Sequence, residues 1–374
     1  MGGIGKTTLA SNIYDDPLSF MCIMKLSAMN TCLPDTNGQR RLIVHGYSLE
    51  DDYPLSNFFG AINDTLESES FARSFLHIGG FDNHLSSRYP YLGFRLLRVL
   101  DVAEKIFYSF PEQLLELHDL ICLAFTSDAK LPCSISLLKN LQTLIVHQKD
   151  LSCLLTLPLE IWEMPQLRHI CFTRCVLPDG AVSSIPRSLE TLSVVRDFKC
   201  TDENFKTIQN LRKLGLSYEY IASSGQWYCL NNLEQLNKLE NLKCLFGVSY
   251  PYGPSVGGFS PKLSFPPNLK KLTLYGSRLT WEDMTLIGSL PKLEVLKLYN
   301  AFEGAVWEPV GGEFPRLKYL KLKFMDLMQW EAEETNFPSL RRLILKQCRW
   351  LKEIPTLQLI QLDDCSLDAV TLSE

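Results

Sequence analysis

The sequence lacks any apolar run of the roughly 20 residues that a membrane-spanning helix requires. It also lacks a C-x-x-C pair, because its 12 cysteines are scattered along the chain. Its first residues offer neither the basic start nor the small-residue cleavage site of a signal peptide. These absences predict a reduced, cytoplasmic protein without a transmembrane segment.

Neither sign of charge dominates. The 374 residues carry a net charge of -5, and 46% of them are hydrophobic, which is typical of a soluble globular chain with one large domain or two. Such mild acidity excludes nucleic acid and membrane surfaces as partners attracted by bulk charge.

Catalytic and metal-binding constellations are missing as well. The six histidines are scattered, and none forms a nucleophile–base pattern. His169, Cys171 and Cys175 lie close together, but H-x-C-x-x-x-C is a poor zinc spacing, so these residues are interpreted as members of a strand. The sequence predicts neither a catalytic residue nor a metal site of this kind.

The first eight residues contain the last part of a phosphate-binding loop, G-x-x-x-x-G-K-[ST], whose final three positions are Gly5, Lys6 and Thr7. In such a loop backbone N–H groups surround phosphate oxygens, Lys6 reaches the β- and γ-phosphates, and the Thr7 hydroxyl binds Mg²⁺. The candidate residues for ADP or ATP are therefore Gly2, Gly3, Ile4, Gly5, Lys6, Thr7 and Thr8, with Thr7 as the metal ligand.

A working loop also needs an apolar strand before it and a second strand that ends in a metal-binding aspartate. No strand precedes Met1, and Leu96–Asp101 ends in aspartate but has the repeat spacing described next. We therefore expect residues 1–20 to be a truncated loop fragment that does not retain nucleotide, followed by a linker over 21–38. Genuine nucleotide binding is the alternative.

From about residue 94 onward the pattern L-x-x-L-x-L recurs at intervals of mostly about 21–27 residues, the period of a leucine-rich repeat. The second leucine position is assigned to Leu100, Leu123, Leu144, Ile170, Leu192, Leu214, Leu245, Leu272, Leu296, Leu320, Leu343 and Ile360. This predicts an α/β solenoid with a concave parallel sheet over 94–374. The wide interval from Leu211 to Leu242 predicts an insertion or a weak additional unit.

Residues 39–93 have no clear period, and we expect them to form an N-terminal cap with irregular first repeats. Within this segment, residues 39–45 and 70–76 are each predicted to form a strand.

Strand alternation sends the residues between the leucines to the concave face. In the last repeats these include Lys271, Tyr275, Lys297, Tyr299, Tyr319, Lys321, Lys323, Arg342 and Lys346. Three interpretations are open at this point: a solvated strand face, a docking surface for an acidic protein such as another domain of a receptor, and a nucleic-acid surface.

The run Gly2–Ala10 closely resembles the loop of plant nucleotide-binding leucine-rich-repeat (NB-ARC) immune receptors. Arg40-Arg41-Leu42 and the irregular repeats resemble the late blight resistance protein homologues of that group. The resemblance implies an intracellular sensor, cytoplasmic or peripheral to a membrane, that exchanges ADP for ATP. It also implies repeats that recognise a pathogen effector or a guarded host protein, and a defence outcome with a hypersensitive response.

The sequence departs from this family pattern, because the coiled-coil domain and most of the nucleotide-binding domain are missing. His118-Asp119-Leu120 spells part of the family's sensor motif, but its repeat spacing assigns it to the repeats. We therefore expect a disease-resistance receptor or its truncated derivative. The competing hypotheses are a repeat scaffold or decoy without nucleotide switching, and a nucleotide-hydrolysing enzyme, against which the missing aspartate argues.

Overall fold

The computed structural model describes residues 21–25, 41–45, 73–78, 94–150, 155–177, 185–219, 230, 232–247, 263–352 and 360–363. The chain divides into two compact units, Met1–Ala181 and Val182–Glu374. Each unit contains its own stack of parallel strands.

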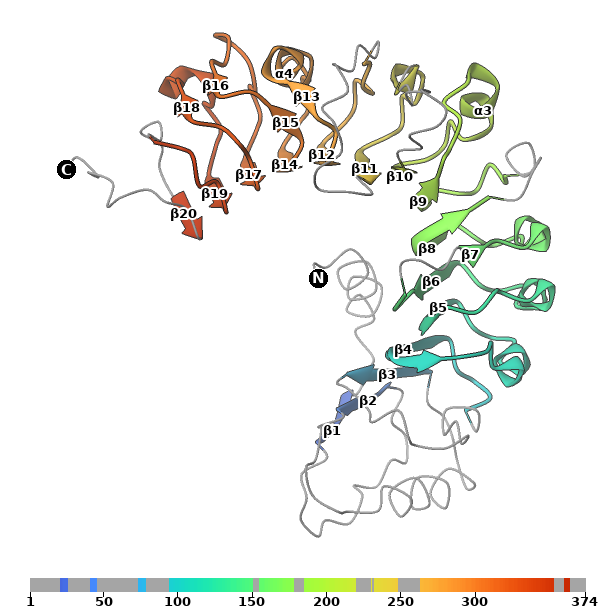
Figure 1. Cartoon of the computed structure of the whole chain (residues 1–374). Helices are drawn as coiled ribbons and strands as arrows, with labels where there is room; N and C mark the ends of the chain where they lie inside the picture. The colour runs from blue at the N-terminus through green and yellow to red at the C-terminus, as the bar shows by residue number, and fades with distance from the viewer. Residues whose placement is uncertain are drawn as a thin grey trace. The chain divides into compact units, whose positions relative to one another are not determined.

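In the first unit a parallel sheet has the order β1-β2-β3-β4-β5-β6-β8, and β7 pairs with β8. The strands lie side by side, with short 3-10 helices in the connections between them (Figure 1). The strands are β1 (Met21–Lys25), β2 (Arg41–His45), β3 (Ser74–Ile78), β4 (Val99–Phe107), β5 (Cys122–Ser127), β6 (Thr143–His147), β7 (Leu155–Thr156) and β8 (His169–Val176). The helices are η2 (Glu112–Glu116), η3 (Cys133–Leu137) and η4 (Leu159–Glu163).

The second unit repeats this plan with the strand order β9-β10-β11-β12-β14-β17-β19-β20. Its sheet strands are β9 (Thr191–Arg196), β10 (Lys213–Glu219), β11 (Asn241–Gly247), β12 (Lys271–Tyr275), β14 (Val295–Tyr299), β17 (Tyr319–Lys323), β19 (Arg342–Lys346) and β20 (Ile360–Asp363).

Short elements occupy the side of the second unit opposite the sheet (Figure 1). They are α3 (Asp202–Thr207), η6 (Leu233–Gln235), η7 (Trp281–Asp283), α4 (Met284–Gly288), η8 (Glu334–Asn336), and two strand pairs. The pairs are β13 (Leu279–Thr280) with β15 (Phe302–Glu303), and β16 (Val306–Trp307) with β18 (Gln329–Trp330). Among the described residues, no helix combines the length and apolarity that crossing a membrane requires.

The leucines that the repeat pattern predicts form the part of the second unit's core that lies against the sheet, and aromatic side chains such as Trp307 and Phe314 are buried with them. Leu296 and Leu298 of β14 lie opposite Leu320 and Leu322 of β17, and all four side chains are 0% exposed. Each such burial contributes roughly 1.5–3 kcal/mol. The intervening side chains are only partly buried, so the alternation of a strand separates core from surface at every second residue.

One repeat has a different register from the predicted one. Leu242 of β11 lies opposite Leu214 and Leu272, so it occupies the second leucine position, and the assignment of Leu245 to that position was wrong. The first position belongs to Leu239, which is buried. Cys244 occupies the third position, where the pattern predicts leucine. Because cysteine stands there, the correct register could not be recognised from the leucine spacing.

The interval after Leu211 ends at Leu239 and not at Leu242, so part of its predicted width came from the wrong register. It contains no additional unit, because β10 pairs directly with β11 and leaves no place for a further strand between them. At the other end of the chain, β1 lies within the segment 21–38 that was predicted to be a linker, and it pairs in parallel with β2. Its sequence, Met-Cys-Ile-Met-Lys, is an apolar run that suits a strand but lacks the leucine spacing. The strands β2 and β3 overlap the two strands predicted in 39–93.

A bulge also shifts β9. Val195, and not the predicted Val194, lies opposite Leu216, because the register shifts by one residue between Leu214 and Leu216. Val194 has a φ of 37°, and a Cβ at Gly215 would lie 2.7 Å from the Val194 backbone nitrogen. Glycine at 215 therefore lets the two strands approach at the bulge.

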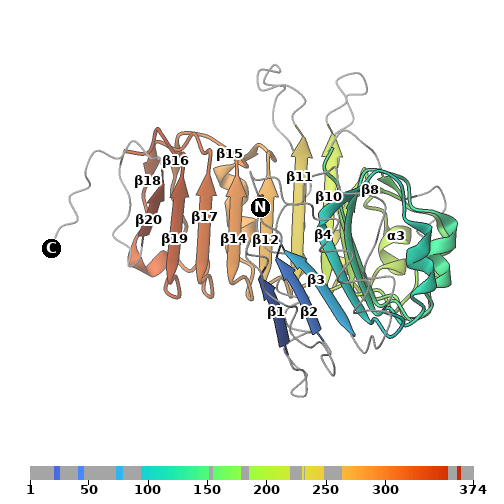
Figure 2. The same cartoon turned by 90° about the horizontal axis from the view of Figure 1, so that it is seen from below.

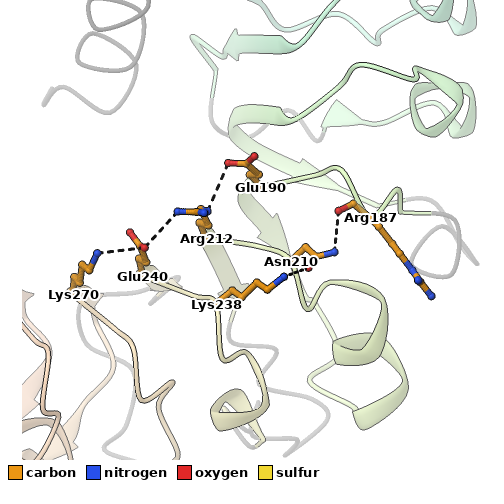
Figure 3. A network of polar contacts seen from close by, with 7 residues as sticks. All are labelled: Arg187, Glu190, Asn210, Arg212, Lys238, Glu240 and Lys270. Carbon is orange, nitrogen blue, oxygen red and sulfur yellow. Dashed lines mark hydrogen bonds and ion pairs between the residues drawn. The ribbon is translucent and has the colours of Figure 1, made fainter.

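Polar side chains link neighbouring repeats at the start of the strands (Figure 3). Arg212 lies between Glu190 and Glu240, at N–O distances of 3.8 and 3.6 Å, and Lys270 reaches Glu240 at 3.3 Å. Asn210 donates to the Arg187 carbonyl at 3.0 Å and accepts from Lys238 at 2.6 Å. Exposed ion pairs contribute about 0–1 kcal/mol each, so this network supports the stack less than the leucines do.

We predict that Leu320→Ala lowers the free energy of unfolding by roughly 2–5 kcal/mol, because it opens a cavity between two repeats. The neighbouring change Lys321→Ala is the matched control and should cost no more than about 1 kcal/mol, because its side chain lies on the opposite face. Urea unfolding of both variants measures the difference, and equal losses would contradict the observed register.

Candidate protein-interaction surface

The predicted partner-binding residues lie together on one face of the second unit. They belong to β12, β14, β17 and β19, four adjacent strands of the parallel sheet (Figure 2). This basic–aromatic face consists of Lys271, Tyr275, Lys297, Tyr299, Tyr319, Lys321, Lys323, Arg342 and Lys346.

The strand register brings these side chains into rows across the sheet. Lys297 lies opposite Lys321, and Tyr275, Tyr299, Lys323 and Lys346 follow one another in a row at the strand ends. Adjacent strands are about 4.8 Å apart, so neighbours in a row are in side-chain contact range. The row ends at β20, where Asp363 lies opposite Lys346.

The tyrosines support the lysines directly. The Tyr275 and Tyr299 rings are stacked, with centroids 4.0 Å apart and planes 5° from parallel. Lys321 places its Nζ 5.5 Å from the centre of the Tyr299 ring. Lys297 and Arg342 lie over the Tyr319 ring, at 5.3 and 5.8 Å from its centre. Cation–π contacts of this kind hold positive charge against an aromatic surface.

The lysines are close enough to repel one another. Partial burial, and then the charge of Lys213, lowers the pKa of Lys271. Burial and then the charges of Lys271 and Lys321 lower the pKa of Lys297. A bound anion would relieve both the burial penalty and the repulsion, so the face favours acidic groups.

Sequence reasoning missed one member of this surface. Lys243 of β11 has its Nζ 5.7 Å from the centre of the Tyr275 ring, and burial, together with the charge of Lys271, lowers its pKa. The register assigned from Leu242 and Leu245 placed Lys243 outside the exposed positions, whereas the register from Leu239 and Leu242 places it on the face.

The residue after each of these strands has an unusual backbone conformation. Gly276, Asn300, Phe324 and Gln347 follow β12, β14, β17 and β19, and their φ values are 62°, 46°, 56° and 55°. The first three donate their backbone N–H to the last strand residue of the next repeat, at 2.9–3.1 Å. A left-handed φ costs roughly 1–2 kcal/mol for residues other than glycine and asparagine, so Phe324 and Gln347 are strained.

The nucleotide candidates Gly2, Gly3, Ile4, Gly5, Lys6, Thr7 and Thr8 lie outside the described residues, so their fit to ADP, ATP or Mg²⁺ stays a prediction. His118 and Asp119 lie in the turn between η2 and β5, followed by the buried Leu120, as their interpretation as repeat residues predicts. His169, Cys171 and Cys175 lie on β8. In the part of the chain that the structure describes, no three His, Cys, Asp or Glu residues are grouped to hold a metal.

We predict that Lys271→Gln stabilises the fold at pH 7 and that this gain shrinks as the pH approaches 10. Because the pKa of Lys271 is lowered in the fold from its usual 10.5, the unfolded chain binds this proton more tightly. The wild type therefore gains stability as the pH rises toward 10.5 and loses it as the pH falls through the lowered pKa. Urea unfolding at several pH values measures the gain. The exposed Lys206→Gln of α3 controls for the loss of one charge, and a gain independent of pH would contradict the prediction.

Comparisons with solved structures found an internalin of Listeria monocytogenes, with 14% identity, 75% of this chain and 86% of that chain covered, and a TM-score of 0.35. The functional domain of InlJ from the same organism has 13% identity, with 82% of this chain and 67% of that chain covered, and a TM-score of 0.40. At this level of similarity the fold assignment depends on the parallel strands and on the family match instead.

The family profile described as "Leucine-rich repeat region" matches residues 72–372. Putative late blight resistance protein homolog R1B-16 of Solanum demissum is 32% identical over 297 residues, which cover 75% of this chain and 22% of that protein. Late blight resistance protein R1-A of the same organism is 32% identical over 296 residues, with 75% and 21% covered. The chain thus spans little more than a fifth of these relatives. It belongs to the leucine-rich-repeat family, within which it resembles the late blight resistance proteins.

Proposed function

We propose that this chain is a plant immune receptor of the disease-resistance class, or a truncated derivative of one. In this role its repeats recognise a pathogen effector or a guarded host protein, and recognition triggers defence and the hypersensitive response. The relationship to late blight resistance proteins supports the class. The repeats correspond to only part of those proteins, so the cytoplasmic location and the signalling role are parts of the proposal.

One observation favours recognition through the basic–aromatic face. Lysines from adjacent strands are held side by side, partly buried, at the cost of mutual repulsion, in a chain whose net charge is -5. Without a partner, this repulsion is offset within the face by the cation–π contacts of Lys297 and Lys321. An acidic protein surface would relieve the repulsion and bury the tyrosines, and interfaces are enriched in tyrosine and arginine. We therefore propose an acidic protein partner and no nucleic acid.

The nucleotide-binding domain of a receptor is one candidate partner, and it provides a direct test. We predict that the triple change Lys297→Glu, Lys321→Glu and Lys346→Glu abolishes binding of the chain to the nucleotide-binding domain of such a receptor in surface plasmon resonance. Wild-type binding should weaken as salt rises from about 0.05 to about 0.5 M, because salt screens charge attraction.

The matched control for this test is the triple change Lys206→Glu, Arg316→Glu and Lys352→Glu, which alters the net charge equally at exposed positions outside the strands. Loss of binding in both triple variants would assign the effect to net charge. Wild-type binding that survives in the Lys297, Lys321 and Lys346 variant would remove the basic–aromatic face from the proposal.

The second candidate function is a repeat scaffold or decoy without nucleotide switching, which is favoured by the extent of the repeat region over residues 72–372 of the chain. In either function we propose that the chain is not an enzyme and does not retain ADP or ATP with Mg²⁺. We predict no heat of binding for ADP or ATP up to millimolar concentration by calorimetry. Tight binding that Lys6→Ala abolishes would contradict this prediction and favour a switching receptor.

A further inference from the structure

Phe324 differs from its counterparts at the end of the neighbouring strands. The equivalent residues Gly276 and Asn300 are types that tolerate a left-handed φ, whereas Phe324 and Gln347 have φ values of 56° and 55°, and of these two Phe324 is the aromatic one. Its side chain is nevertheless 47% exposed, so the strained conformation does not bury the ring in the core. The repeat sets this backbone conformation, because the Phe324 N–H donates to the Lys346 carbonyl as Gly276 and Asn300 donate in their own repeats. The exposed ring, by contrast, buries little surface within the fold, so the choice of an aromatic residue here points to a contact outside it.

The position of Phe324 connects it to the basic–aromatic face. It directly follows Lys323, whose Nζ lies 4.3 Å from the centre of the Phe324 ring. Lys323 in turn lies opposite Tyr299, which is stacked on Tyr275. The Phe324 ring therefore borders the row of aromatic and basic side chains at the strand ends.

We propose that Phe324 is the apolar anchor of this face, and that the partner presents an acidic segment containing one aromatic side chain that packs on Phe324. Lys321 and Lys323 would then bind the carboxylates on either side of that aromatic side chain. Interfaces combine a central aromatic contact with a polar surround in this way. The proposal rests on the proposed function, since it assigns the partner of the same face a more specific chemistry.

The test uses the whole chain and two dye-labelled synthetic peptides, one of ten glutamates and one with tryptophan replacing a central glutamate. Fluorescence anisotropy at low salt measures binding to the wild type, Phe324→Ala and Phe324→Asn. We expect the tryptophan peptide to bind the wild type about three- to tenfold more tightly than the glutamate peptide, the range of one aromatic contact. In both variants this preference should disappear, while binding of the glutamate peptide changes less than about twofold.

A stability measurement on the same variants tests the strain separately. Both substitutions remove the ring, but asparagine tolerates a left-handed φ better than alanine does. We therefore expect Phe324→Asn to melt about 2 °C above Phe324→Ala. Tyr108 is the matched control, an aromatic residue that is 78% exposed and is not among the residues with positive φ. There the asparagine variant should not melt above the alanine variant.

The possible results distinguish a failure of the Phe324 anchor from a failure of the acidic partner. If the tryptophan preference persists in both Phe324 variants, or if their melting temperatures are equal, Phe324 is not a strained anchor and this inference is overturned, while the acidic partner stands. If the wild type binds neither peptide, or if the triple change to glutamate at Lys297, Lys321 and Lys346 leaves binding intact, the acidic partner itself is excluded, and the anchor with it.

Discussion

The structure depends on one constraint, which is that a single repeat cannot bury its own leucines. Leu296 and Leu320 become fully buried only because their strands lie in parallel at a fixed register with neighbours on both sides. A slip of one residue would expose the leucines and bury lysines such as Lys297 and Lys321. The register is therefore maintained by the difference in free energy between burying a leucine side chain and burying the ammonium group of a lysine.

The same constraint creates the candidate surface. Once alternate residues are committed to the core, those between them must lie on the opposite face, whatever their charge. The core stabilises each repeat by several kcal/mol, which exceeds the contribution of any exposed charge pair. The fold can therefore tolerate several lysines in adjacent rows and a strained Phe324 beside them. Features that weaken the fold locally and gather on one face are the best guides to its function.

Contacts between repeats contribute unequally to the stability of the stack. The network around Arg212 and Asn210 aligns the starts of neighbouring strands, but its members are largely exposed. Its contribution lies mainly in orienting the backbone, whose N–H groups pair with carbonyls of the preceding repeat. The Arg212 N–H, for example, donates to the Glu190 carbonyl at 2.8 Å.

Most of the repeat architecture can be predicted from the sequence, because leucine spacing reports directly on burial and needs no knowledge of distant contacts. The sequence also placed the nine residues of the basic–aromatic face correctly on alternate strand positions. The sequence failed where another residue type filled a core position, as Cys244 did in β11, and where an apolar strand such as β1 lacked the leucine pattern. It also did not anticipate the shift at Val194, since a bulge depends on the approach of the neighbouring strand at Gly215.

Which side chains contact one another depends on how the repeats stack. The stacking of Tyr275 on Tyr299, the placement of Lys243 over Tyr275 and the left-handed φ of Phe324 all result from the exact register between strands that are more than 20 residues apart in sequence. Periodicity determines which face a residue occupies, because it is a local property of the strand. Contact, repulsion and strain are properties of pairs, and pairs exist only once the repeats are stacked.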